Sequence, residues 1–309
     1  MRPIKNTLLV LSTGTIFVYF SERLFWARFR PGDSALDWFW TWIVYSLMAY
    51  VFLWLVSHFR VKNIWALFLA GAAFGWVGEG VVVQTTYEML PLSISFTGLA
   101  WHALITVWVG WYALRKALVT SSGATLKWAA IIGLAFGLWA ISWWLDPAGG
   151  VATVMEFASH VCLSTLLVVP AYGVAIWSAS ESFTPSRWVT GIVIGLFALW
   201  FVLVAVPAVP IAIMALPVLL GLVYWGLRRN WLNEDDGSML DALRGPVPVG
   251  RLLCLGVVPL IGTLVYAAAL GFNLQWQTNW VLYLITTPLG FILFGVGLYK
   301  MFVVKPVPH

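Results

Sequence analysis

Two side chains that could act together on a substrate or a metal ion stand four residues apart, in the segment Glu156-Phe157-Ala158-Ser159-His160. On a helix this spacing places a carboxylate and an imidazole on the same face. The pair predicts either two ligands for one divalent metal ion or a carboxylate that orients the histidine. The alternative interpretation is a structural ion pair that fastens the helix to a neighbour.

Glu79 and His102 also fall within long apolar segments. An ionisable group inside a membrane is costly and is therefore taken as functional by default. Glu79 lies between Gly78 and Gly80, which let a helix or a substrate approach the backbone closely. We expect Glu79 to act as a catalytic general base and His102 to be a third metal ligand beside the pair above. The structural alternatives are a protonated Glu79 bonded to backbone and a His102 that anchors to lipid headgroups.

Two further carboxylates lie on predicted connections. Asp146 is a candidate catalytic residue or fourth metal ligand, although the Asp-Pro pair that it begins also favours a turn. Glu88 could share a site with Glu79 only if the helix ends between them, and is otherwise a solvated loop residue. Two histidines with carboxylates form an acceptable ligand set for Zn or Fe, and the sequence does not distinguish these metals. His102 and His160 could instead bind a haem between two helices.

Three arginines, Arg23, Arg28 and Arg30, precede the second apolar segment. Their guanidinium groups are candidates for binding the phosphate or carboxylate of a lipid or cofactor, because the guanidinium fork matches those anions. The alternative is that they pair with three acids of the same stretch, which would leave it neutral. Those acids are Glu22, Asp33 and Asp37.

The rest of the chain determines where these residues would stand. Of its 309 residues 61% are hydrophobic and only 9% are charged, whereas a soluble domain has about a quarter charged residues. This composition excludes a soluble enzyme, a disordered chain and a conventional nucleic-acid binder. Since a spanning helix needs about 20 mostly apolar residues, we predict an all-α, polytopic membrane bundle of about ten helices. The expected spans are 7–20 (continuing through residue 25), 38–57, 64–84, 98–114, 127–145, 152–178, 188–206, 208–227, 252–270 and 280–303.

The basic residues predict the orientation. With ten alternating spans, 14 of the 17 Lys and Arg residues lie on the side of the two termini, and the other three are the arginines described above. The positive-inside rule then places both termini in the cytoplasm of a multi-pass protein of the cell membrane. In this orientation the ionisable residues of the third to sixth spans gather in the outer half of the bundle. Residues 85–97 could form an external loop or a re-entrant segment.

The two halves of the chain differ in character. We predict one transmembrane domain over residues 1–309, in which a half at about 1–180 has the polar candidates and a half at about 181–309 is apolar and rich in proline. The second half could face lipid, a second copy of the chain or another membrane subunit through its last four spans. Cys162 and Cys254 both fall inside spans, and no disulfide between them is expected.

Four functions remain open at this point. The favoured one is an integral membrane enzyme with an outward-facing intramembrane site that performs metal-assisted hydrolysis or transfer on a lipid-like or small apolar substrate. The second is a transporter or channel for protons or a small cation, with Glu79, Glu156 and His160 as a relay. The third is a haem- or pigment-binding membrane subunit. The fourth is an assembly subunit whose polar residues only join helices.

Overall fold

The computed structural model describes residues 2–30, 32–145, 150–179, 183–233, 237–274 and 278–303. Within these ranges every regular element is a helix, and ten helical segments are long and apolar enough to cross a membrane. The all-helical class and the number of spans predicted from hydropathy are therefore confirmed. The ten segments are Pro3–Trp26, Ala35–His58, Ile64–Val82, Ser93–Thr120, Ser122–Ser142, Val154–Ser178, Arg187–Ala208, Ala212–Leu232, Val249–Gly271 and Tyr283–Val303.

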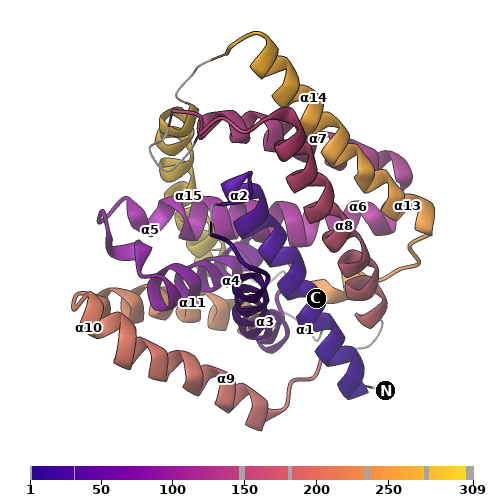
Figure 1. Cartoon of the computed structure of the whole chain (residues 1–309). Helices are drawn as coiled ribbons and strands as arrows, with labels where there is room; N and C mark the ends of the chain where they lie inside the picture. The colour runs from indigo at the N-terminus through magenta and orange to yellow at the C-terminus, as the bar shows by residue number, and fades with distance from the viewer. Residues whose placement is uncertain are drawn as a thin grey trace.

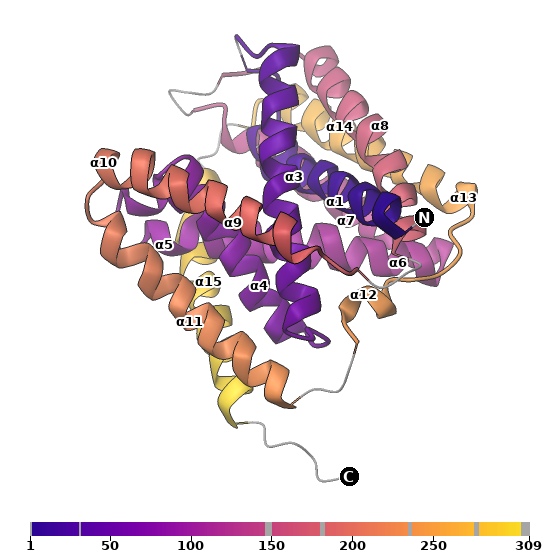
Figure 2. The ribbon, with the colours of Figure 1, turned by 90° about the horizontal axis from the view of Figure 1, so that it is seen from below.

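Short π-helical and 3₁₀ turns divide several spans into the elements used below. Figure 1 labels the α-helices except α12, which Figure 2 labels. The first half of the chain contains α1 (Arg2–Val18), η1 (Tyr19–Arg23), α2 (Leu24–Trp26), α3 (Ala35–His58), α4 (Ile64–Val77), η2 (Gly78–Val82), η3 (Thr85–Tyr87), α5 (Ser93–Phe96), η4 (Gly98–Leu114), α6 (Arg115–Thr120), α7 (Ser122–Ser142) and α8 (Val154–Ser178). The second half contains α9 (Arg187–Trp200), η5 (Phe201–Ala205), α10 (Val206–Ala208), α11 (Ala212–Asn233), α12 (Met239–Ala242), α13 (Val249–Leu253), η6 (Cys254–Gly256), α14 (Val257–Gly271) and α15 (Thr278–Val303).

Side-chain caps determine where several of these helices begin. Ser34 accepts a hydrogen bond from the backbone N–H of Asp37 over 3.2 Å, and the Asp37 carboxylate accepts one from the Ser34 N–H over 3.0 Å. Thr153 and Glu156 form the same reciprocal pair at the start of α8. Asn63 caps α4. These caps satisfy N–H groups that have no partner within the first turn of a helix.

The helices of the first half form the centre of the bundle. Helices α1, α3 and α4 lie in the middle, with α9 and α10 along one edge and α13 and α14 along the opposite edge (Figure 1). Helix α1 contacts α3 and α8, α4 contacts η4, α11 and α15, and α14 packs against α7. The third span, which contains Glu79, is 78% buried, whereas the seventh is only 11% buried. The third span, with Glu79, is therefore part of the interior of the protein.

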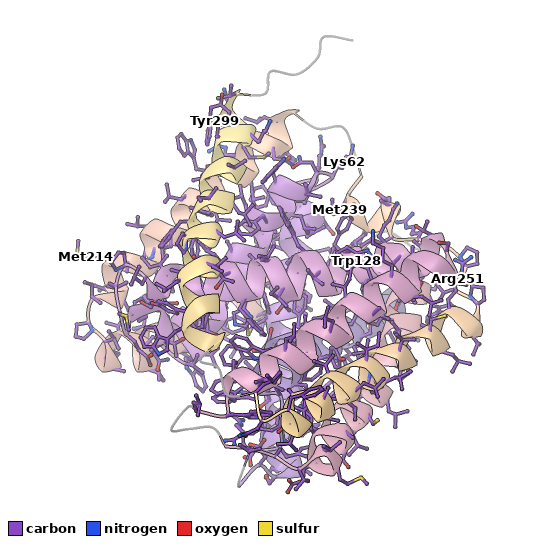
Figure 3. The ribbon with its side chains drawn as sticks, turned by 90° about the horizontal axis from the view of Figure 1, so that it is seen from above. Lys62, Trp128, Met214, Met239, Arg251 and Tyr299 are labelled. Atoms are coloured by element: carbon purple, nitrogen blue, oxygen red, sulfur yellow. The ribbon has the colours of Figure 1, made fainter. Side chains whose placement is uncertain are left out.

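The edge helices expose large apolar side chains. Met214 of α11 is 72% exposed and Tyr299 of α15 is 60% exposed, and both project from the periphery in Figure 3. Such faces need an apolar environment, which lipid would provide for helices of this length. Contact of the last four spans with another copy or subunit remains a prediction.

Candidate functional site

The structure brings Glu79 and His102 together from two different spans. Glu79 lies in η2, the π-helical turn that extends α4, and His102 lies near the start of η4. The imidazole Nε2 of His102 donates a hydrogen bond to Oε1 of Glu79 over 2.7 Å. The side chains are only 4% and 13% exposed, respectively. Burial of two ionisable side chains inside apolar helices costs free energy. The Glu79–His102 pair is therefore the first candidate for a functional site.

A chain of hydroxyl groups continues behind His102. The hydroxyl of Ser21 lies 3.0 Å from Nδ1 of His102, and the hydroxyl of Thr106 lies 2.9 Å from that of Ser21. With the Nε2 proton directed at Glu79, one consistent arrangement of the hydrogens has Ser21 donating to Nδ1 and accepting from Thr106. Thr85 donates a further hydrogen bond to Oε2 of Glu79. The donors of this network are thus all directed toward one carboxylate.

Small residues allow the two spans to approach closely enough for this pair to form. A side chain added at Gly71 of α4 would lie 3.0 Å from Cα of Ala103, and one at Gly75 would overlap the carbonyl group of Gly98. Such backbone contact between helices is possible only where side chains are absent or very small. The ring of Phe74 also lies edge-on to the His102 ring, with centroids 5.3 Å apart. The crossing of α4 and η4 therefore sets the position of both functional side chains.

The connection after η2 folds back over Glu79. Helix η2 ends at Val82, and η3 and α5 follow within residues 85–97, the segment predicted to be a loop or a re-entrant structure. Tyr87 donates to the carbonyl of Gly80 over 2.9 Å, and its burial raises the pKa of the phenol to about 12. The helix does end between Glu79 and Glu88, as a shared site would require, but the Glu88 side chain is exposed. Thr85 of this connection does reach Glu79.

A second carboxylate, that of Glu22, faces the same cavity as Glu79. Glu22 lies in η1, and its carboxylate accepts hydrogen bonds from the Tyr45 hydroxyl over 2.7 Å and from Nε1 of Trp26 over 3.1 Å. Glu22, Asp37 and Glu79 together line a cavity of about 370 Å³, whose remaining wall is largely aliphatic and aromatic. This volume falls within the range of small-molecule sites, about 300–1,000 Å³.

Sequence reasoning did not select Glu22, Ser21 or Tyr45 for the site. Hydropathy leaves the end of the first span anywhere between residues 20 and 25, so the sequence places Glu22 in the loop that follows. The span extends to Trp26, and an end placed there would have identified Glu22 as an intramembrane carboxylate. Ser21 and Tyr45 give no comparable signal, because hydroxyl groups are ordinary within spanning helices.

The predicted metal ligands Glu156 and His160 take different partners although they stand four residues apart. The Glu156 carboxylate accepts from the backbone N–H of Thr153 over 2.7 Å and from its hydroxyl over 2.8 Å. Nε2 of His160 donates to the carbonyl of Arg23 over 2.9 Å. Among the residues that the structure describes, no three His, Cys, Asp or Glu side chains are grouped to hold a metal ion. Asp146 lies outside the described residues, and metal or haem binding remains a prediction.

The three arginines proposed for anion binding differ in their surroundings. Arg30 forms an ion pair with Asp33 over 3.2 Å. The guanidinium group of Arg23 stacks 3.0 Å above the centre of the Trp38 ring and lines a separate cavity of about 400 Å³. Arg28 is half-buried. Of the acids suggested as partners, Asp33 pairs with an arginine, while Glu22 and Asp37 make the other contacts described above. Anion binding by the arginines remains a prediction.

Comparison of the chain with known protein families, with characterised proteins and with solved structures finds no match. The class defined here is therefore that of a helical protein with ten candidate membrane spans and a carboxylate–imidazole pair at a cavity. Its function has to be inferred from the chemistry of that cavity.

Proposed function

We propose that this protein is an integral membrane enzyme that performs general acid–base catalysis at the cavity lined by Glu79 and Glu22. The observation that carries the proposal is the hydrogen bond of His102 to Glu79 at the cavity wall. A general base has to be positioned within reach of a substrate proton and held in a fixed orientation. His102 and Thr85 hold the Glu79 carboxylate in a fixed orientation, and the cavity allows a substrate proton to come within its reach.

Glu79 and Glu22, two of the three carboxylates that line the cavity, have different environments, which suits them to different roles. We assign the base to Glu79, which takes a proton from a water molecule or a substrate hydroxyl. The hydroxyl groups of Ser21 and Thr106 can rotate when the charge on Glu79 changes. The hydrogen bonds around His102 can therefore adjust to both protonation states of Glu79. Glu22, held by the Tyr45 hydroxyl, is assigned the acid: it enters the cycle protonated and gives that proton to the leaving group. Exchange with water then removes the proton from Glu79 and reprotonates Glu22. The net reaction class is hydrolysis or group transfer.

The substrate class is a lipid-like or small apolar molecule of the bilayer. Apart from its three carboxylates, the cavity wall is largely apolar and includes Trp40, Val44 and Met48. The distribution of basic residues supports an orientation in which both termini are cytoplasmic and the cavity opens toward the outer side of the cell membrane. Metal assistance with His102, Glu156 and His160 as ligands is retained as a prediction from the sequence.

Proton-coupled transport is the second candidate, because Glu79, His102, Ser21 and Thr106 form a continuous hydrogen-bonded chain. A relay of buried carboxylates and histidines is typical of proton pathways. This hydrogen-bonded chain, however, runs only from Glu79, near the end of the third span, to Thr106, near the middle of the fourth. It therefore covers about half the length of a span. Catalysis at the cavity therefore accounts for the geometry better than passage across the membrane.

Turnover of membrane lipids by the purified protein tests the proposal. The full chain is reconstituted into liposomes made from a total lipid extract, and products are followed by mass spectrometry. We expect wild-type protein to form a new product and Glu79→Gln to reduce its rate by about 100-fold or more. The matched control is Glu88→Gln, an exposed carboxylate nine residues away, which should retain the wild-type rate. Equal rates for the wild type and Glu79→Gln would contradict the proposed role, and Glu79-dependent proton uptake without product would favour transport.

A further inference from the structure

A second cavity, of about 410 Å³ and almost wholly apolar, continues the acidic cavity along the same two helices. On α3 its wall includes Val51 and Leu55, and on the α4–η2 side it includes Val77 and Val81. Residues of the acidic cavity stand within one helical turn of these, at position 48 on α3 and at positions 78, 79 and 82 on η2. The two cavities therefore follow one another along α3 and α4–η2, with carboxylates lining the first and hydrocarbon side chains lining the second. We call the two compartments together the groove.

Met48 lies at the boundary between the compartments. Its side chain is only 2% exposed, and its terminal methyl carbon stands 2.7 Å from the position that a Cβ of Gly78 would occupy. Gly78 thus provides the space that the Met48 side chain fills. Methionine is unbranched and has three rotatable bonds, so this partition can change its shape without movement of the backbone.

The seventh and eighth spans cover the apolar compartment. Phe197 of α9, Phe201 of η5 and Leu216 of α11 form this side of its wall. Helix α9 contacts α3, η5 contacts η2, and Figure 2 shows α9 running across α3. Because the segment Arg187–Ala208 is only 11% buried, this cover rests on a narrow line of contacts. Ile194 and Ala198 of α9 line the compartment and are themselves exposed, so the compartment opens at the edge of this helix.

We infer that this groove binds an amphiphile with one hydrocarbon chain, whose headgroup presents ammonium or hydroxyl donors to the carboxylates of Glu22, Asp37 and Glu79. Among the described residues no basic side chain lines the acidic compartment, so an anionic headgroup would meet like charges. From Asp37 to Leu55 α3 rises by about 27 Å, at about 1.5 Å per residue. That length accommodates a headgroup and a long chain. The binding mode rests on the proposed function, since it places the headgroup at the catalytic carboxylates.

Photo-crosslinking tests the groove directly. The probe is a long-chain alkylamine with a diazirine near the end of its chain, added to the purified full-length protein in detergent, and the labelled peptides are mapped by mass spectrometry. We expect saturable labelling of residues 51–55 and 197–201, competed by the unlabelled amine. A fatty acid with the same diazirine-bearing chain should label these residues at least about tenfold less.

Two variants of the exposed helix α9 separate groove binding from general contact with amphiphile. Ala198 lines the apolar compartment and is exposed, so Ala198→Trp should fill the compartment without disturbing the core, and should reduce labelling about tenfold. Leu196 of the same helix is exposed and does not line the cavity, so Leu196→Trp should leave labelling unchanged. Unsaturable labelling spread equally over α14 and α15, or equal labelling by the fatty acid, would overturn the inference.

The experiments distinguish failure of the proposed groove binding from failure of the proposed enzyme activity. Glu79→Gln should abolish turnover but only weaken the saturable labelling of residues 51–55, because Glu22 and Asp37 still face the headgroup and the chain compartment does not include Glu79. Labelling in a wild-type protein that forms no product would support the groove and count against the enzyme. Turnover without saturable labelling would overturn the groove alone.

Discussion

The pairing of Glu79 with His102 predicts a strong energetic coupling between two residues that are 23 positions apart in the chain. The perturbation is a double-mutant cycle of Glu79→Ala and His102→Ala. Their contact is 2.7 Å long, and the side chains are 13% and 4% exposed, so solvent screens it weakly. A hydrogen bond to a charged group contributes about 1.5–3 kcal/mol, and removal of one partner of a buried pair costs about 3–5 kcal/mol. Each single variant should therefore lose about 3 kcal/mol of unfolding free energy or more.

The double variant should lose little more than either single variant, because no charged or polar group of the pair is then left without its partner. The expected interaction energy is therefore about 3 kcal/mol, the upper end of the range for residues in contact. Unfolding in mild detergent, followed by loss of tryptophan signal with increasing denaturant, measures it. The matched control is the Arg30–Asp33 ion pair, in which Arg30 is 37% exposed and which should couple by about 1 kcal/mol or less. A Glu79–His102 coupling no larger than that of this control would refute the reasoning.

Three further substitutions test how the site is built. Gly75→Val should displace α4 from η4, with a loss of about 1–3 kcal/mol of stability and a loss of turnover. Gly191→Ala, in open space on α9, is the control and should lower neither quantity. A melting temperature of Gly75→Val equal to that of the wild type would contradict the close crossing. Tyr45→Phe removes a donor to Glu22, so turnover should fall about tenfold or more with a loss of about 1–3 kcal/mol of stability; unchanged turnover would argue against Glu22 as the acid. Glu156→Gln should slightly lower the melting temperature, through the weaker cap of α8, and leave turnover intact, whereas a loss like that of Glu79→Gln would favour the metal-ligand prediction.

Hydropathy was sufficient to predict the helical class and the ten spans, because a spanning helix needs a long apolar run that few other structures require. The cost of intramembrane charge also directed attention to Glu79 and His102 individually. Their contact could not be predicted, since it depends on the crossing of α4 with η4 at Gly71 and Gly75. Small residues at a helix surface show that a close approach is possible, but they do not identify the partner helix.

Glu156 shows how a local contact can override a plausible pair. Its spacing from His160 suggested joint action, yet Thr153 stands three residues before it, which is the capping-box pattern. The carboxylate at this position satisfies N–H groups of its own helix start, a contact available without any tertiary arrangement. A capping residue should therefore be considered first when a carboxylate follows a Thr or Ser by three positions at the expected start of a span.

The effect of Glu79 and His102 on turnover, alone and together, tests the central claim most directly. The measurement compares product formation by wild type, Glu79→Gln, His102→Gln and the double variant in liposomes, at equal amounts of folded protein. If the two residues act as one unit, each single substitution lowers the rate by about 10²–10⁴-fold, and the double variant is no slower than the more severe single one. Wild-type turnover in either single variant would contradict the account.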